Sequence, residues 1–284
     1  MTENIVIMAG GVGSRLYPLS TPEHPKQFLD LLDCGKTLIQ LTYERFLAVS
    51  PNAEFWVVTS RDYVHFVREQ LPEVPADHIL AEPAMRNTAP CISYACRKIR
   101  KQFPDANLAV TPADAYVRDV DAFSLTLRKA LDFTASNEAI VSVGITPDWP
   151  CPDYGYIHAP SSGTGVVKVL SFKEKPSVDT AREYLAEGGY WWNAGIFVAR
   201  AATLEDELRT FAPGIESVMD VIEPALGGPD EESILAENFP LCPKISIDYA
   251  VIEKSSKVYA ISAPWEWSDL GSFSAIEKIR GKIL

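Results

Sequence analysis

The sequence lacks the patterns of disulfide-rich and zinc-binding proteins. Its 284 residues include five cysteines, an odd number with no C-x-x-C pair, so neither a disulfide framework nor a zinc ribbon is indicated. The four histidines are scattered along the chain, and no H-E-x-x-H pair occurs. The cysteine content is therefore typical of a reducing compartment.

Positive charge and long apolar runs are also scarce. Lysine and arginine total 26 against 38 aspartate and glutamate, which gives a net charge of −12. This is the wrong sign for a general nucleic-acid or anionic-membrane binder. No apolar run approaches the roughly 18 residues of a membrane span, and the first residues lack the basic and apolar regions of a signal peptide. We therefore expect a cytoplasmic protein with neither a nucleic acid nor a membrane as partner.

The first half of the chain has the pattern of an α/β fold. Hydrophobic residues make up 47% and charged residues 23%, close to globular averages. Strand-like runs at 5–8, 55–59, 108–111 and 139–145 alternate with helical patterns at 37–50, 63–71, 88–103 and 123–134. This alternation predicts a Rossmann-like mixed, mostly parallel sheet with helices on both faces.

The pattern changes after residue 147. Runs at 154–158 and 166–172 flank the turn-rich stretch 161–165, which predicts an antiparallel excursion. Further along, we expect a helix at 177–187, strands at 191–199 and 258–262, an acidic loop at 227–233 and a last helix at 269–280. We expect a single domain over residues 1–284, with halves 1–147 and 148–284.

The strongest motif is a glycine-rich loop directly after the first strand, Gly10-Gly11-Val12-Gly13-Ser14-Arg15-Leu16. Glycines let the backbone approach a ligand and expose successive amide N–H groups, which suit phosphate oxygens. The loop is not a Walker A motif, because no Gly-Lys-Ser/Thr follows at the required spacing. It is not a dinucleotide fingerprint either, because Leu16 stands where the third glycine belongs. Arg15 in the loop and Lys26 after it predict two cations at one phosphate site.

With Pro18-Leu19-Ser20 and Pro25-Lys26-Gln27-Phe28, this loop resembles the sugar-1-phosphate nucleotidyltransferases, in particular the mannose-1-phosphate guanylyltransferases. Similar segments follow in order along essentially the whole chain. They are Glu82-Pro83, Arg86-Asn87-Thr88-Ala89-Pro90, Pro112-Ala113-Asp114, Tyr154-Gly155-Tyr156-Ile157, Glu174-Lys175-Pro176, Trp192-Asn193-Ala194-Gly195, Ser246-Ile247-Asp248-Tyr249-Ala250 and Trp267-Ser268-Asp269-Leu270-Gly271-Ser272.

The resemblance implies a reaction and a set of site residues. GTP and mannose 1-phosphate would give GDP-mannose and pyrophosphate with Mg²⁺ as cofactor, residues 1–147 binding the nucleotide and 148–284 the sugar phosphate. The implied catalytic residues are Arg15, Lys26, Asp114 and Asp269, the last two also as metal ligands. The implied nucleotide-binding residues are Gly10, Gly11, Gly13, Ser14, Glu82, Asn87 and Thr88. The implied sugar-phosphate residues are Gly155, Glu174, Lys175, Asn193 and Asp248.

The residue types suit this chemistry on their own terms. A sugar phosphate is largely dianionic at pH 7, because its second pKa is about 6, so it attacks without a general base. Such a reaction needs positioning and charge neutralisation, and an acidic protein must supply cations locally. Arg15, Lys26, Lys173 and Lys175 are the candidates. Magnesium suits two carboxylates at the ends of apolar runs, where loops over a parallel sheet gather.

The chain departs from the family pattern in places. Ala115 stands where relatives usually have histidine, and Ser14 and Tyr17 replace the more usual threonine and tryptophan. The chain stops soon after residues 269–272, so we expect neither a C-terminal β-helix nor an isomerase domain. Whether the chain forms a homodimer is left open by the sequence.

Other interpretations stay open at this point. The alternatives to a GDP-mannose enzyme are a UDP- or dTDP-sugar pyrophosphorylase and a catalytically silent sugar-nucleotide sensor. A glycosyltransferase is disfavoured, because it would leave the glycine-rich loop and Lys26 unexplained. Asp114 can be a plain turn residue and Asp269 the N-cap of the last helix. The run Asp119-Val120-Asp121 mimics a metal-binding D-x-D motif, but we expect it to start a helix with Asp121 as cap.

Overall fold

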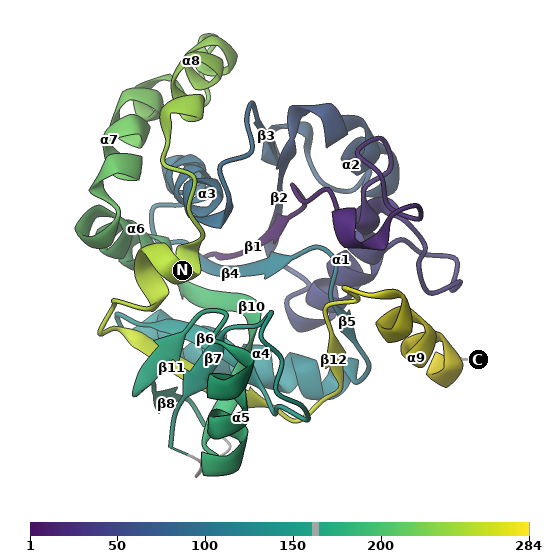
Figure 1. The fold of residues 1–284 in the computed structure, drawn as a ribbon. Coiled ribbons are helices and arrows are strands. Elements are labelled where there is room, and N and C mark those ends of the chain that lie inside the picture. Colours follow the sequence, from purple (N-terminus) through teal and green to yellow (C-terminus); the bar gives the residue numbers. More distant parts are fainter. Residues whose placement is uncertain (161–164, 284) are drawn as a thin grey trace.

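The computed structural model describes residues 1–160 and 165–283, and its main sheet crosses the molecule between two layers of helices (Figure 1). The strand order is β3 (Ile79–Glu82), β2 (Glu54–Ser60), β1 (Glu3–Met8), β4 (Asn107–Pro112), β10 (Tyr190–Arg200), β6 (Ile140–Ile145), β11 (Val258–Ala263) and β8 (Val167–Lys168). β3, β2, β1 and β4 are parallel, as are β6 and β11, whereas β10 runs antiparallel between β4 and β6. The predicted mixed, mostly parallel sheet is therefore confirmed.

The antiparallel excursion after residue 147 is also confirmed. β7 (Tyr156–His158) pairs with β10 and with β9 (Ser171–Lys173), and β8 pairs with β11, all antiparallel. Residues 161–164 of the expected turn lie outside the described residues. A separate small sheet pairs β5 (Tyr116–Val117) with β12 (Trp267–Ser268).

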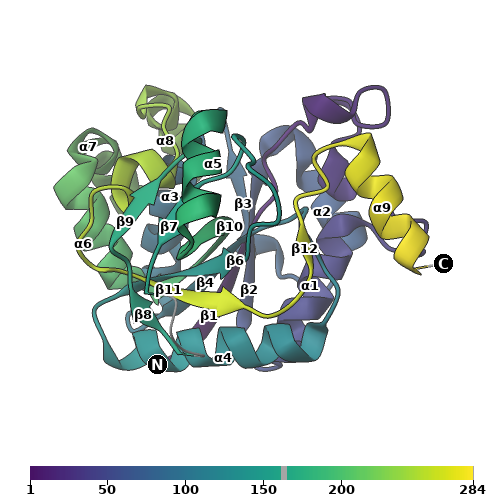
Figure 2. The same ribbon diagram turned by 60° about the horizontal axis from the view of Figure 1, so that its bottom comes forward.

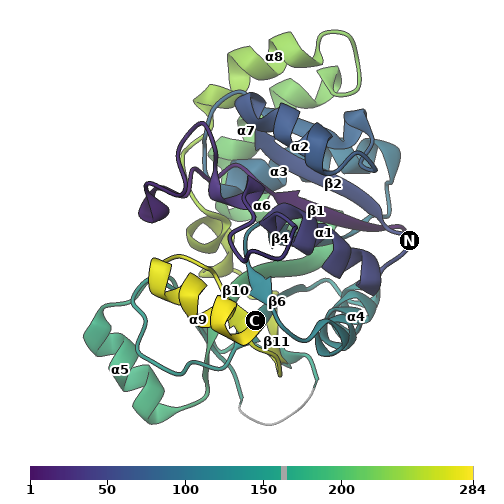
Figure 3. The ribbon, with the colours of Figure 1, turned by 90° about the vertical axis from the view of Figure 1, so that its right-hand side faces the viewer.

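Helices cover both faces of the sheet because apolar residues on adjacent strand positions point to opposite sides. Val6 of β1 faces the layer of α3 (Thr88–Gln102), α6 (Ala201–Phe211) and α7 (Pro213–Ile222), against which α8 (Glu231–Asn238) packs. Ile5 and Ile7 face α1 (Leu38–Val49), α2 (Val64–Gln70) and α4 (Val120–Ser136). Figure 2 shows α4 along one face of the sheet, and Figure 3 shows α5 (Val178–Glu187) at the periphery.

Two helix starts differ from the sequence interpretation. α4 begins one residue after Asp119, whose Oδ1 accepts a hydrogen bond from the Ala122 N–H, so the predicted cap at Asp121 is wrong. The last helix, α9 (Phe273–Ile283), starts four residues later than predicted, and Asp269 lies in the turn before it. The interpretation of Asp269 as an N-cap is therefore wrong.

α9, at the end of the described chain, packs against the last residue of the glycine-rich loop. Its Ile276 and Ile279 pack with Leu16 and Leu38 in a small apolar cluster that also contains Leu270. This packing holds the turn containing Asp269 beside the end of the glycine-rich loop and the residues that follow it. No helix in the described part of the chain is long and apolar enough to cross a membrane.

Candidate active site

The predicted site residues converge at one edge of the main sheet. β1, β3 and β4 are parallel, so the glycine-rich loop, Glu82 and Asp114 all lie at their carboxyl ends. β10 runs the other way, and Asn193 near its start pairs with Gly144 near the end of β6. The reversal of β10 therefore brings Asn193 to the same edge.

Hydrogen bonds from one side chain fix the glycine-rich loop. Gln27 Nε2 donates to the carbonyl oxygens of Ala9 at 2.8 Å and Gly11 at 2.9 Å. Gly13 has φ +62°, and a β-carbon there would lie 2.5 Å from Ser20 Oγ. A side chain at residue 13 would thus clash as well as strain the backbone. Ser14 begins a short 3₁₀ turn, η1 (Ser14–Leu16), that carries Arg15.

Lys26 joins both predicted metal ligands. Its side chain is only 6% exposed, and Nζ lies 3.0 Å from Asp114 Oδ2. The same Nζ donates to the backbone carbonyl of Asp269, 243 residues away in sequence. The structure therefore brings together Lys26, Asp114 and Asp269, as the motifs predict.

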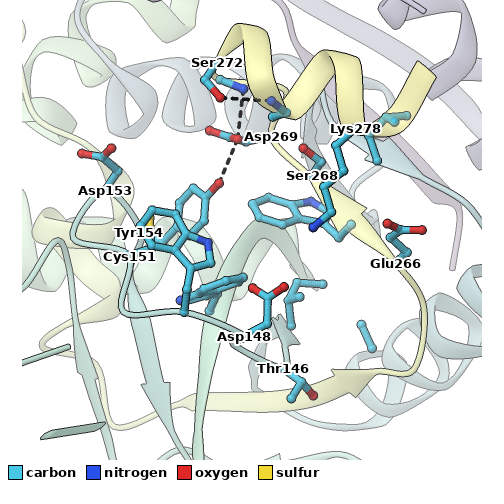
Figure 4. A pocket seen from close by; sticks show the side chains of 18 of the residues that line it. Thr146, Asp148, Cys151, Asp153, Tyr154, Glu266, Ser268, Asp269, Ser272 and Lys278 are labelled. Carbon is cyan, nitrogen blue, oxygen red and sulfur yellow. Dashed lines mark hydrogen bonds between the residues drawn. The ribbon is translucent and has the colours of Figure 1, made fainter. Parts of the chain in front are cut away.

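The Asp269 carboxylate is held from several sides. Tyr154 Oη donates to Oδ1 at 2.8 Å (Figure 4). The Gly271 N–H donates to the same oxygen at 3.0 Å, and Arg15 Nη2 lies 3.4 Å from Oδ2. Burial and the Asp269 charge raise the pKa of Tyr154 far above its ordinary value, so this hydroxyl stays a donor. Arg15 is 63% exposed and also lies 3.9 Å from Asp153.

A cavity of about 920 Å³ adjoins this group (Figure 4). Of the predicted site residues, Arg15 and Asp269 line it, together with Tyr154, Trp192 and Lys278. Trp192 belongs to the core on the α4 side of the sheet. Its neighbour Asn193 points to the opposite side, as strand alternation requires. The cavity thus lies next to the predicted sugar residues and does not coincide with them.

The predicted base-binding residues lie along β3 and at the start of α3. Glu82 is buried, its Oε1 has no hydrogen-bond partner among the described residues, and burial raises its pKa to about 8. Glu82 Oε2 would lie 3.3 Å from a β-carbon at Gly10, so the carboxyl faces the glycine-rich loop. Asn87 Oδ1 accepts a hydrogen bond from the Thr88 N–H at 2.8 Å.

Thr88 connects this segment to the predicted sugar residues. Its Oγ1 accepts a hydrogen bond from the Ile247 N–H at 2.9 Å. Asp248 follows directly and begins the π-helical turn η7 (Asp248–Ile252). The two halves of the predicted site therefore meet at residues 88 and 247–248.

The predicted sugar-phosphate residues form one polar cluster. Asn193 Nδ2 donates to Asp248 Oδ1 at 2.8 Å, and the Asn193 N–H donates to the Gly155 carbonyl at 2.8 Å. Lys175 Nζ lies 2.6 Å from Glu174 Oε1. The predicted set is thus brought together.

The charges in this cluster perturb one another. Burial raises the pKa of Asp248, and the nearby Glu174 carboxylate raises it further. Burial alone would lower the pKa of Lys175, but its contacts with Glu174 and the charge of Asp248 raise it. Lys175 therefore stays a cation among acids.

The sequence interpretation missed residues that support the site. Tyr154 appears in a quoted motif, but its contact with Asp269 is not predicted, and Glu253 is not singled out at all. Glu253 Oε1 accepts a hydrogen bond from the Glu174 N–H at 2.8 Å and lies 3.7 Å from Lys173 Nζ. Lys173, a predicted phosphate cation, is thus paired with an acid beside the cluster.

The sequence profile of the family described as nucleotidyl transferase matches residues 4–284. The chain belongs to the nucleotidyl transferase family. The resemblance drawn from the motifs is confirmed. The chain is 36% identical to mannose-1-phosphate guanylyltransferase of Escherichia coli K12, over 96% of this chain and 59% of that relative. It is 40% identical to mannose-1-phosphate guanylyltransferase of Salmonella typhimurium LT2, over 98% of this chain and 58% of that relative.

A solved structure extends this similarity to the fold. The Thermus thermophilus protein described as a mannose-1-phosphate geranyltransferase superposes with a TM-score of 0.86 at 33% identity. The match covers 98% of this chain and 79% of that one. This nucleotidyl transferase chain spans less than two thirds of the length of the curated relatives named above.

Proposed function

We propose that this chain makes GDP-mannose and pyrophosphate from GTP and mannose 1-phosphate. The observation that carries the proposal is the position of Lys26, which contacts Asp114 and Asp269 beside the glycine-rich loop. A buried cation, two acids and exposed backbone amides in one place suit phosphoryl chemistry. The names of the Escherichia coli and Salmonella relatives support mannose 1-phosphate and a guanine nucleotide.

The proposed reaction is a single in-line displacement. An oxygen of the sugar phosphate forms a bond to the α-phosphorus of GTP, and the bond from that phosphorus to the bridging oxygen of the β-phosphate breaks. Pyrophosphate leaves with the bonding electrons. Because the attacking phosphate is already largely dianionic at pH 7, the residues need only position the reactants and neutralise charge.

The nucleotide is proposed to lie over residues 1–147. Backbone amides of Gly10, Gly11, Gly13 and Ser14 would contact the triphosphate, and Arg15 and Lys26 would neutralise the departing β- and γ-phosphates. Glu82 would accept the adjacent N1–H and N2–H₂ donors of guanine as a carboxylate, the form that these two hydrogen bonds would favour over the protonated form of the free protein. Asn87 and Thr88 would complete the base site at the start of α3.

The sugar phosphate is proposed to lie over residues 148–284. Lys175 would pair with the attacking phosphate, while Glu174, Asn193, Asp248 and the Gly155 backbone bind sugar hydroxyls. Mixed donors and acceptors in one cluster suit a hydroxyl-rich ligand. The cytoplasmic location expected from the composition stays a prediction.

The residues present fit a magnesium ion. The Asp114 carboxylate and the Asp269 backbone carbonyl both contact Lys26, and both side chains offer carboxylate oxygens, the ligands that magnesium prefers. No cluster of three or more acidic, histidine or cysteine side chains suited to a metal occurs among the described residues. Magnesium is usually held by one or two carboxylates plus substrate phosphates and waters, so two acids suffice. Bound there, it would supply charge stabilisation at the reacting phosphates.

The test is pyrophosphate release from each of four nucleoside triphosphates with mannose, glucose or N-acetylglucosamine 1-phosphate. GTP with mannose 1-phosphate should give the highest kcat/KM. A preference for UTP or dTTP with glucose 1-phosphate would instead assign a UDP- or dTDP-sugar pyrophosphorylase. Binding of GDP-mannose without turnover of any pair would assign a silent sensor.

A further inference from the structure

One buried serine lies against the proposed sugar site. Ser142 stands in the middle of β6 among apolar residues, and its side chain is fully buried. A buried hydroxyl is costly unless it is hydrogen-bonded. Ser142 Oγ lies 3.0 Å from Asn193 Oδ1, on the neighbouring strand β10.

The same amide oxygen has a second donor. The Gly195 N–H donates to Asn193 Oδ1 at 3.0 Å. Because the peptide N–H can only donate, the oxygen of the Asn193 amide faces it, and Ser142 must be the donor in its own contact. The amide nitrogen is thereby directed to Asp248 Oδ1, at 2.8 Å.

An irregularity in the sheet creates this arrangement. Asn193 pairs with Gly144 and Phe197 pairs with Ser142, so 194–196 of β10 face the single residue Val143 of β6. The extra residues turn the backbone at Gly195, which has φ +72°, back onto the Asn193 side chain. Bulges of this kind re-aim side chains next to functional sites.

We propose that Ser142 is a positioning residue for the sugar 1-phosphate: its hydroxyl fixes the orientation of the Asn193 amide and, through it, the Asp248 carboxylate. The proposal rests on the proposed function of the Asn193 and Asp248 cluster. Ser142 itself is buried beneath Asn193 and belongs to the sheet core. Its effect on substrate therefore passes through Asn193.

The test compares Ser142→Ala with Ser142→Thr. Alanine removes the hydroxyl in an apolar strand, and KM for mannose 1-phosphate should rise about two- to tenfold, the range of one net hydrogen bond. KM for GTP should not change. Threonine keeps the hydroxyl and suits a strand, so it should restore KM toward that of the parent.

A matched control separates positioning from stability. Ser93 is also fully buried and donates to Glu216 Oε1 at 2.5 Å, within the helical layer that contains α3 and α7. Ser93→Ala should leave KM for mannose 1-phosphate unchanged. Melting temperatures and circular dichroism of all variants identify any that fail to fold.

The outcomes are distinguishable. If Lys175→Ala raises KM for mannose 1-phosphate and folded Ser142→Ala does not, the positioning role is overturned while the proposed sugar site stands. If Ser142→Ala raises KM and Ser142→Thr does so equally, the hydroxyl is not the cause and the role is again overturned. If Lys175→Ala raises the KM values of both substrates equally, the proposed sugar site fails, and the role of Ser142 fails with it.

Discussion

The backbone of Gly155 lies directly against the carboxylate of Glu174. A β-carbon at residue 155 would lie 2.4 Å from Glu174 Oε2 and 2.9 Å from Phe172 Cζ. Glu174 is buried, and its position is also fixed by Lys175 at 2.6 Å. Glycine at residue 155 is therefore needed for space beside a charged side chain.

We expect Gly155→Ala to displace the Glu174 carboxylate and to weaken binding of mannose 1-phosphate. Hydrogen bonds to charged groups contribute about 1.5–3 kcal/mol, which corresponds to a rise in KM of about 10- to 150-fold. Steady-state kinetics measures this directly. Gly165→Ala is the control, because a β-carbon there meets nothing within 4 Å. Parent-like KM for folded Gly155→Ala would show that Glu174 does not bind the sugar.

Lys26→Ala should reduce kcat without unfolding the chain. Removing one preorganised charged donor from a site of this type costs about 10²–10³ in kcat, and Lys26 is the buried cation between Asp114 and Asp269. Pyrophosphate release and circular dichroism are the measurements. Lys36→Ala removes an exposed lysine paired with Glu44 and serves as the control. A turnover within about threefold of the parent's rules out the assigned role.

Glu82→Gln should reduce the preference for GTP over UTP. Guanine offers two adjacent donors to a carboxylate, whereas uracil lacks this pair, and an amide has only one acceptor atom. The measurement is the ratio of kcat/KM for GTP to that for UTP, both with mannose 1-phosphate. Glu69→Gln, a change of an exposed acid on α2, is the control. An unchanged ratio removes Glu82 from the base site.

Glu82 should also make stability depend on pH. Burial raises its pKa to about 8 from the ordinary 4.5. The folded state then binds the proton more tightly than the unfolded state, so this stabilising contribution is complete below pH 4.5 and is lost as pH rises through 8. Urea unfolding at pH 5, 7 and 9 should show that, as the pH rises, the free energy of unfolding of the parent falls relative to that of Glu82→Gln. A constant difference between the two proteins would contradict the raised pKa.

Much of the fold follows from local patterns, but strand direction and some helices do not. The run at 191–199 predicts a strand, yet nothing in its periodicity indicates that β10 runs antiparallel between β4 and β6. The acidic composition of the stretch 227–233 predicts a loop, whereas α8 starts at Glu231. Acidic residues also stabilise the first turn of a helix, so the same residues suit either structure.

In the candidate site, too, local sequence predicts some features and tertiary structure determines the others. The motifs supply every residue of the polar cluster, because each is a chemically distinctive short segment. Its supporting contacts depend on tertiary structure: Tyr154 meets Asp269 from 115 residues away. Ser142 reads as one polar residue in a buried strand until the irregularity in β10 places Asn193 beside it.

The last prediction concerns the two proposed magnesium ligands. Lys26 Nζ contacts the Asp114 carboxylate and the Asp269 backbone carbonyl, and Asp269 is not a helix cap, because α9 starts at Phe273. If either acid were only structural, its replacement by asparagine would leave the dependence on metal intact. As ligands, both should be needed for Mg²⁺-dependent turnover.

We therefore expect Asp114→Asn and Asp269→Asn each to abolish Mg²⁺-dependent pyrophosphate release. The double variant should lose no more than the single variants, because residues that act as one unit are not additive. Activity is measured against Mg²⁺ concentration for all three. Asp148→Asn, which removes a carboxylate from the adjoining cavity, controls for the change in local charge and should keep the parent's dependence. A single variant that retains this dependence excludes that residue as a ligand, since a carboxylate that binds magnesium cannot be replaced by a neutral amide without weakening the site.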